Sequence, residues 1–306
     1  MIVKRILRVI MITMIVIFLI AVAFDVASSI LSHNIRSTFE GGILDEVEYI
    51  EVRGHTLAYR TYGEANERTL VFIHGFMGNS FDYHALSTAL QDDYRIIAID
   101  LIGFGQSDKP LDYDYSKANQ AETIKAALDA LDISPFALGG HSMGGEIALR
   151  LIRAHPDAAK RLILFASAGL QTSQPSGFPP FINEFIVKNY FVQRLGFNFT
   201  VHQPDDDVKD HFKTMFYMNT EIPGDVIREF SKAEDDENVI DFLDTLVIET
   251  LIIYGAEDRV TPPAFGETFD EALANSAYVL LEAIGHLPFI EAPEAVEDAL
   301  RAFLEE

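Results

Sequence analysis

Residues Gly139–Glu146 read GGHSMGGE and place one serine, Ser142, among four glycines. Glycine weakens the interior of a strand or a helix, so this cluster indicates a backbone that needs a tight turn or a close approach. An apolar run at 136–138 precedes it and a helical pattern at 146–154 follows it. Residues 140–144 match G-x-S-x-G, and in a strand–turn–helix context this motif forms a nucleophile elbow that lifts the serine hydroxyl above the sheet edge. The alternative is a tight turn without chemistry, and the context favours a catalytic Ser142.

Short apolar runs and helical patterns alternate along the rest of the chain. The runs cover residues 70–73, 96–99, 136–138, 162–165, 251–254 and 278–281. Such unbroken runs are typical of strands buried on both faces of a parallel sheet. A helical pattern at 118–131 lies between two of them, and alternating residues at 47–52 and 56–60 predict a hairpin ahead of them. We therefore expect an α/β fold with a mostly parallel central sheet flanked by helices, and catalytic groups beyond the carboxyl ends of the strands.

Residues at about 170–245 interrupt this alternation. Prolines open the segment, phenylalanines follow, and acidic helical patterns close it, which predicts an inserted helical cap. Its phenylalanines are expected either to line an apolar acyl pocket or to fill the cap's own core. They are Phe178, Phe181, Phe185, Phe191, Phe197 and Phe199.

A serine nucleophile needs a base, which is itself oriented by an acid. His286 is the candidate base, because it follows the last apolar run in a loop expected at the sheet's carboxyl edge. Asp258 follows the preceding run and is the candidate acid, with the adjacent Glu257 as the alternative. Residues 166–169, after the run at 162–165, contain no carboxylate and cannot supply the acid.

Two backbone N–H groups are expected to form an oxyanion hole. One belongs to Met143, directly after the serine, and the other to Phe76 in the loop after the first parallel strand. His74 in that loop and His141 in the elbow are interpreted as structural residues rather than catalytic ones.

From about Glu48 to Leu304 the chain resembles the α/β-hydrolase superfamily, specifically its esterase-like branch with a cap. The motifs that carry the resemblance are His74-Gly75-Phe76, Asp100–Asp108 (DLIGFGQSD), the Ser142 elbow, Gly255-Ala256-Glu257-Asp258 and Gly285-His286. Members with aspartate at the elbow are dehalogenases or epoxide hydrolases, and the serine argues against both. The motifs are specific for the fold and much less specific for the substrate.

Composition excludes several classes of function. The formal net charge of −24 over 306 residues repels nucleic-acid phosphates, so no nucleic-acid partner is expected. The chain has no cysteine, which excludes disulfides and thiol catalysis. It carries no phosphate-binding glycine loop, C-x-x-C or H-E-x-x-H pattern, so neither a cofactor nor a metal is implied.

The N-terminus predicts a membrane segment. Lys4, Arg5 and Arg8 precede residues 9–24, which are apolar except for Thr13. We expect an uncleaved transmembrane-type anchor within residues 1–30, a linker at 31–45, and a catalytic domain at 46–306 on the extracytoplasmic side. The alternative is a signal peptide cleaved near residues 21–23, followed by secretion.

These features together predict a serine hydrolase. Its expected reaction is cleavage of a small carboxylic ester with an apolar acyl group through an acyl-serine intermediate. Two alternatives remain open. One is C–C bond hydrolysis of dienoic ketones by the same triad, which polar cap residues such as Arg194 would favour. The other is a non-catalytic binding module on this fold.

Overall fold

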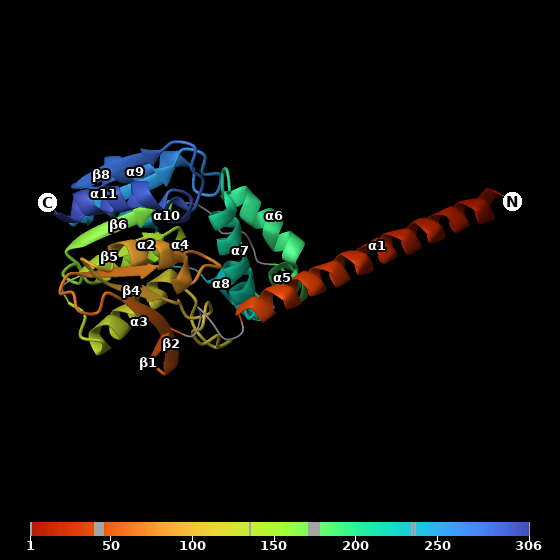
Figure 1. Ribbon diagram of the computed structural model, residues 1–306, viewed down its shortest axis with the longest axis horizontal. Coiled ribbons are helices and arrows are strands. Elements are labelled where there is room, and N and C mark those ends of the chain that lie inside the picture. The colour runs from red at the N-terminus through yellow and green to blue at the C-terminus, as the bar shows by residue number, and fades with distance from the viewer. Residues whose placement is uncertain are drawn as a thin grey trace.

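A central sheet organises this computed structural model, which describes residues 2–39, 46–134, 136–170, 178–233, 235 and 237–305 (Figure 1). Within those residues, eight strands form one sheet in the order β1-β2-β4-β3-β5-β6-β7-β8. The strands are β1 Glu48–Val52, β2 His55–Tyr62, β3 Thr69–Ile73, β4 Arg95–Ile99, β5 Phe136–His141, β6 Arg161–Phe165, β7 Glu249–Gly255 and β8 Ser276–Leu281. β2 runs antiparallel to β1 and β4, and all the other pairs are parallel. The predicted hairpin and the mostly parallel sheet are confirmed.

Helices cover both faces of this sheet, which explains the unbroken apolar runs. One face carries α3 (Lys117–Ala130), α4 (Met143–Ala154) and α9 (Pro263–Ala272). The other carries α2 (His84–Leu90), α10 (Pro288–Glu291) and α11 (Pro293–Glu305), with the short helix η1 (Ser80–Tyr83) beside them. In β3, β4 and β6 every residue after the first is buried. A strand enclosed on both faces has no solvent-exposed side, so its residues need not alternate in polarity.

The cap lies between β6 and β7. It contains α5 (Pro180–Lys188), α6 (Tyr190–Thr200), α7 (Asp206–Asn219), α8 (Gly224–Lys232), η2 (Val239–Asp241) and η3 (Leu243–Thr245). A small apolar core holds α6 and α7 together. It consists of Phe197, Val201, Val208, Phe212 and Phe216. Residues 171–177 of the predicted cap lie outside the described residues.

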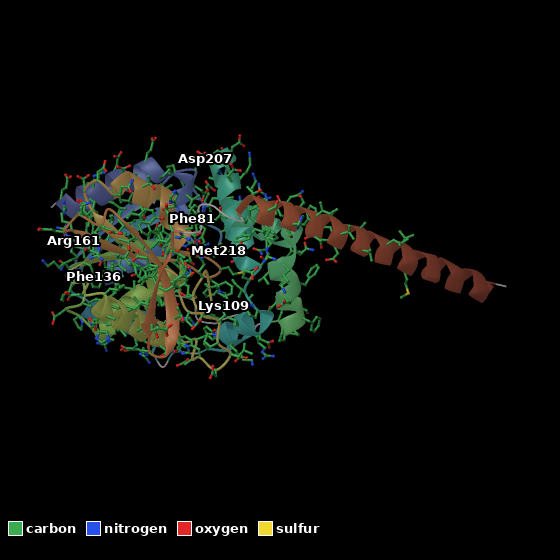
Figure 2. All side chains as sticks on the ribbon, turned by 60° about the horizontal axis from the view of Figure 1, so that its bottom comes forward. Phe81, Lys109, Phe136, Arg161, Asp207 and Met218 are labelled. Atoms are coloured by element: carbon green, nitrogen blue, oxygen red, sulfur yellow. The ribbon has the colours of Figure 1, made fainter. Side chains whose placement is uncertain are left out.

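Helix α1 (Ile2–Phe39) extends away from the body toward the N-terminus (Figure 1). Residues 31–39, predicted to belong to a linker, continue this helix, and residues 40–45 lie outside the described part of the chain. Figure 2 shows the body from another direction, with oxygen-tipped side chains such as Asp207 spread over its surface, as the acidic composition requires.

The predicted transmembrane anchor is not supported. Among the residues that the structure describes, no helix combines the length and the apolar character needed to cross a bilayer. The position of the catalytic domain relative to a membrane, and cleavage near residues 21–23, stay predictions.

The second half of α1 packs against the cap instead. The hydroxyl oxygen of Ser28 accepts the Tyr190 N–H at the start of α6, at 2.8 Å. The ring of Phe24 lies 4.7 Å from that of Phe191. Ile35 packs against the apolar core of the cap. The last turns of α1 are therefore part of the folded body, although their polar composition suggested a linker.

Candidate active site

The elbow at Ser142 joins β5 to α4. Ser142 has φ 51° and ψ −119°, a left-handed conformation that costs a non-glycine residue about 1–3 kcal/mol. Its N–H donates to Phe165 O at 3.0 Å, and its carbonyl accepts the N–H groups of Gly145 (3.0 Å) and Ala168 (2.9 Å). These bonds to β6, to the segment after it and to the first turn of α4 hold the strained turn in place. Because the turn occupies only Ser142, α4 begins at Met143, three residues earlier than the helical pattern indicated.

Close packing explains the glycines of this segment. A Cβ atom on Gly140 would lie 2.3 Å from the carbonyl oxygen of Gly144. A Cβ on Gly144 would lie 2.3 Å from the carbonyl oxygen of Ile73, at the end of β3. No side chain fits at either distance, so the strand, the turn and the helix can approach this closely only with glycine.

The predicted base and acid lie side by side beyond the ends of β8 and β7. His286 Nδ1 donates to Asp258 Oδ2 at 2.7 Å, and the two side chains are 6% and 0% exposed. The predicted alternative acid, Glu257, is exposed. The structure therefore brings Asp258, and not Glu257, to the histidine.

Three further donors fix the Asp258 carboxylate. Oδ1 accepts the N–H groups of Val260 (2.7 Å) and Thr261 (3.0 Å), and the Thr261 hydroxyl donates to Oδ2 at 2.9 Å. Thr261 was not recognised as a site residue from the sequence. The pattern Asp258-x-x-Thr261 is the available signal, because a threonine this close after an acid can bond back to its carboxylate.

His141 ties the elbow to the His286 loop. Its Nε2 donates to the His286 carbonyl at 2.8 Å, and the two rings lie 4.7 Å apart. Burial, followed by the nearby His286, lowers the pKa of His141 to about 3, so the ring is neutral. Since Ser142 follows His141 directly, this bond holds the elbow close to the loop that carries His286. The expectation that His141 is structural is confirmed.

The two predicted oxyanion donors flank the serine. In the described part of the chain, neither the Phe76 N–H nor the Met143 N–H has a protein acceptor. A Cβ on Gly75 would lie 3.1 Å from Ser142 Cβ, so the loop that carries Phe76 lies against Ser142. Both N–H groups are therefore available to a ligand beside Ser142.

His74 has the structural role that was predicted for it. Its Nδ1 donates to Gly75 O at 2.7 Å, and its Nε2 accepts the Leu101 N–H at 3.0 Å. Burial lowers the pKa of His74, which keeps this neutral form. Asp100 is fully buried and accepts the N–H groups of Ser80 (2.5 Å) and Gln106 (2.7 Å), so it fastens two loops and reaches no reacting group.

Phe76 also provides apolar surface at the site. Phe76 is 46% exposed, and its ring centroid lies 5.5 Å from that of Phe104 and 6.1 Å from that of Phe230 in cap helix α8. The cap phenylalanines, expected either to line an acyl pocket or to fill the cap's core, occupy both buried and exposed positions. Phe197 is buried in the cap core, whereas four others are exposed: Phe178, Phe181, Phe185 and Phe199. The cap-core interpretation is confirmed for Phe197 and wrong for the four exposed residues, for which lining of an acyl pocket stays a prediction.

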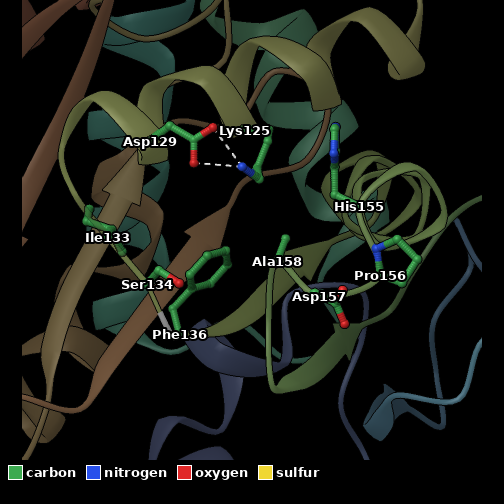
Figure 3. A pocket seen from close by; sticks show the side chains of 9 residues that line it. All are labelled: Lys125, Asp129, Ile133, Ser134, Phe136, His155, Pro156, Asp157 and Ala158. Carbon is green, nitrogen blue, oxygen red and sulfur yellow. Dashed lines mark hydrogen bonds and ion pairs between the residues drawn. The ribbon is translucent and has the colours of Figure 1, made fainter.

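A cavity of about 310 Å³ lies at the other end of β5 (Figure 3). Phe136, the first residue of β5, lines it, together with the Lys125–Asp129 ion pair and His155. Six residues of extended strand span about 20 Å, so this cavity is separate from Ser142. Within the described ranges, no three histidine or acidic side chains are grouped to hold a metal ion.

Comparison with known proteins agrees with this geometry. Residues 68–293 match the family model of the alpha/beta hydrolase fold. The chain is 29% identical to the uncharacterized hydrolase YugF of Bacillus subtilis over 83% of this chain and 96% of that protein. It is 26% identical to Lipase 1 of Psychrobacter immobilis over 82% of this chain and 81% of that protein. The crystal structure of a bacterial membrane phospholipase A superposes with a TM-score of 0.73 and 25% identity, over 96% of this chain and 97% of that one. The chain belongs to the α/β-hydrolase fold family.

Proposed function

We propose that the protein is a serine hydrolase that cleaves a carboxylic ester with an apolar acyl group. The observation that carries the proposal is the buried His286–Asp258 pair beside the strained Ser142 elbow. Such a pair serves to withdraw the proton of a neighbouring hydroxyl, and Ser142 is the hydroxyl that the fold presents.

The reaction follows from these contacts. Because His286 Nδ1–H is bonded to Asp258, Nε2 has a free lone pair and accepts the proton of Ser142 as its oxygen attacks the ester carbonyl. The N–H groups of Phe76 and Met143 stabilise the oxyanion of the tetrahedral intermediate. Imidazolium Nε2–H then protonates the leaving alkoxide, and the alcohol departs from the acyl-serine. Water, deprotonated by Nε2, attacks the acyl-serine and releases the carboxylic acid and Ser142.

Two observations favour an ester substrate with an apolar acyl group. Among the relatives, Lipase 1 is named for ester hydrolysis and the superposed phospholipase A for cleavage of a lipid ester. The exposed Phe76 ring also gives an acyl chain apolar surface beside the proposed oxyanion hole.

The alternatives receive less support. Arg194, the cap residue that would favour C–C bond hydrolysis, lies 4.8 Å from the Phe212 ring in the cap core. A non-catalytic module would not react with a fluorophosphonate, whereas an activated Ser142 forms a phosphonyl ester. Labelling of the wild-type protein therefore distinguishes the enzyme from the binding module.

A panel of p-nitrophenyl esters of increasing acyl length tests the proposed substrate class. We expect kcat/KM to rise by up to about fourfold per methylene, the equivalent of about 0.8 kcal/mol, until the apolar surface is covered. Phe76→Ala should flatten this rise while it leaves the backbone N–H in place. Phe185→Ala is the matched control, because Phe185 is similarly exposed, at 48%, and lies on cap helix α5 rather than in the loop against Ser142. If no ester in the panel is turned over, the proposal is wrong.

The pH dependence tests the base. His286 must be neutral to accept a proton, so kcat/KM should fall on acidification. Burial lowers the pKa values of His74 and His141, the latter to about 3. Both rings therefore favour the neutral form, and we expect neither to add a second protonation to the acidic side of the profile. We expect a slope of one in log kcat/KM against pH, measured from about pH 5.5 to 8. A rate that does not change over this range would contradict the assignment of His286.

A further inference from the structure

The loop that carries His286 is fastened on both sides by a single carboxylate, that of Glu291. Its Oε2 accepts the Gly285 N–H at 3.1 Å, and its Oε1 accepts the Leu287 N–H at 3.1 Å. Glu291 is the last residue of α10, the short helix that follows the loop. One side chain therefore fixes the residues immediately before and after the base.

The same carboxylate also reaches the cap. Oε2 accepts the His202 N–H at 2.7 Å, just beyond the end of α6. The last residue of α6, Thr200, accepts the His286 N–H through its carbonyl, also at 2.7 Å. A Cβ on Gly285 would lie 2.5 Å from that carbonyl, so the end of the cap helix is pressed against the catalytic loop.

An ionised glutamate is costly at this position. Burial raises the pKa of Glu291, and its backbone N–H bonds oppose that effect only in part. A carboxylate has acceptor sites on both oxygens, whereas an amide would present an NH₂ group to at least one of the three N–H donors. The acid is thus the side chain that satisfies all three donors at once.

We propose that Glu291 is a positioning residue for His286 and couples the cap to the catalytic base. With Glu291 in place, the loop is held at Gly285 and Leu287 by the carboxylate, at His286 N–H by Thr200, and at His286 O by His141. Loss of the carboxylate leaves three N–H groups without their acceptor and releases the loop from the cap. The imidazole then deviates from the line between Ser142 and Asp258.

Glu291→Gln in the full chain tests this assignment, which rests on the proposed ester hydrolysis. The substitution keeps the size of the side chain and at least one acceptor, so the protein should fold even if Glu291→Ala does not. We expect kcat to fall about tenfold to a hundredfold, the scale of a displacement of about 1 Å, with KM within about threefold of wild type. The downfield proton resonance of the His286–Asp258 hydrogen bond should broaden or shift. Glu294→Gln is the control, because it removes the same charge from an exposed position on α11 and should leave both readouts unchanged.

Fluorophosphonate labelling separates the possible failures. The turnover rate is divided by the concentration of labelled Ser142. If a variant is only partly folded, its kcat is therefore calculated from the folded fraction alone. A wild-type kcat per labelled site in Glu291→Gln, with the resonance in place, overturns the positioning role, even if the melting temperature falls. A wild-type protein that is not labelled at all contradicts the proposed function instead.

Discussion

Replacing Ser142 with alanine is expected to lower kcat for ester hydrolysis by about four to six orders of magnitude. The hydroxyl is the atom that would form the covalent intermediate, and nothing in an alanine side chain can replace it. The Phe76 and Met143 N–H groups remain, so a residual rate above that of the uncatalysed reaction should persist. The left-handed backbone at position 142 imposes similar strain on alanine and serine, so the fold should be preserved.

The measurement is kcat on the best p-nitrophenyl ester, together with the melting temperature. Ser134→Ala is a matched control, because Ser134 is exposed and lines the cavity at the opposite end of β5. It should retain wild-type turnover. Ester turnover close to wild type in Ser142→Ala would remove Ser142 from the mechanism and with it the proposed function.

The sheet and the pairing of His286 with Asp258 could be predicted from the sequence because both follow from local sequence patterns. An unbroken apolar run such as Leu70–Ile73 indicates a strand that is buried on both faces of the sheet. In the structure these residues form most of β3. In a parallel sheet the carboxyl ends of the strands share one edge, so residues that follow different runs meet there. This rule correctly predicted that His286 and Asp258 lie close together, although 28 residues separate them in the sequence.

The partners of exposed or amphipathic segments could not be predicted in this way. Phe181 and Phe197 lie in the same phenylalanine-rich part of the cap, yet one is 73% exposed and the other is buried. Periodicity assigns a residue to a helix face, but which neighbour covers that face depends on tertiary packing. The same limit applies to Ser28, whose bond to the start of α6 joins positions 162 residues apart.

A residue that would position a catalytic group by bonding to main-chain atoms is also difficult to predict from the sequence. The Glu291 carboxylate accepts three hydrogen bonds, all from main-chain N–H groups. Every residue except proline has such a group, so the sequence does not mark these partners. A motif search finds side chains whose chemistry is distinctive, such as Ser142 and His286. An acid that serves only as an acceptor resembles any other surface glutamate until its donors are located.

Replacing Asp258 with asparagine is expected to lower kcat by about four orders of magnitude while the fold is retained. The N–H groups of Val260 and Thr261 both donate to Oδ1, so the asparagine carbonyl oxygen will occupy that position. Its NH₂ group then replaces Oδ2 and faces His286 Nδ1, at the 2.7 Å separation that Oδ2 now has. An NH₂ group donates, so Nδ1 must accept and the ring proton moves to Nε2. In that tautomer Nε2 cannot take the proton of Ser142.

Glu257→Gln provides the matched control, because it makes the same chemical change at the neighbouring position. Glu257 is exposed, whereas the Asp258 side chain is fully buried against His286. We therefore expect Glu257→Gln to keep kcat within about twofold of wild type, since an exposed charge in high-dielectric surroundings has little influence on the triad. Both variants are compared with wild type by steady-state kinetics and by the downfield proton resonance of His286, which should be lost only in Asp258→Asn. The reverse result, a large loss of kcat in Glu257→Gln and little change in Asp258→Asn, would show that the adjacent glutamate is the acid, through a rearrangement of the loop after β7.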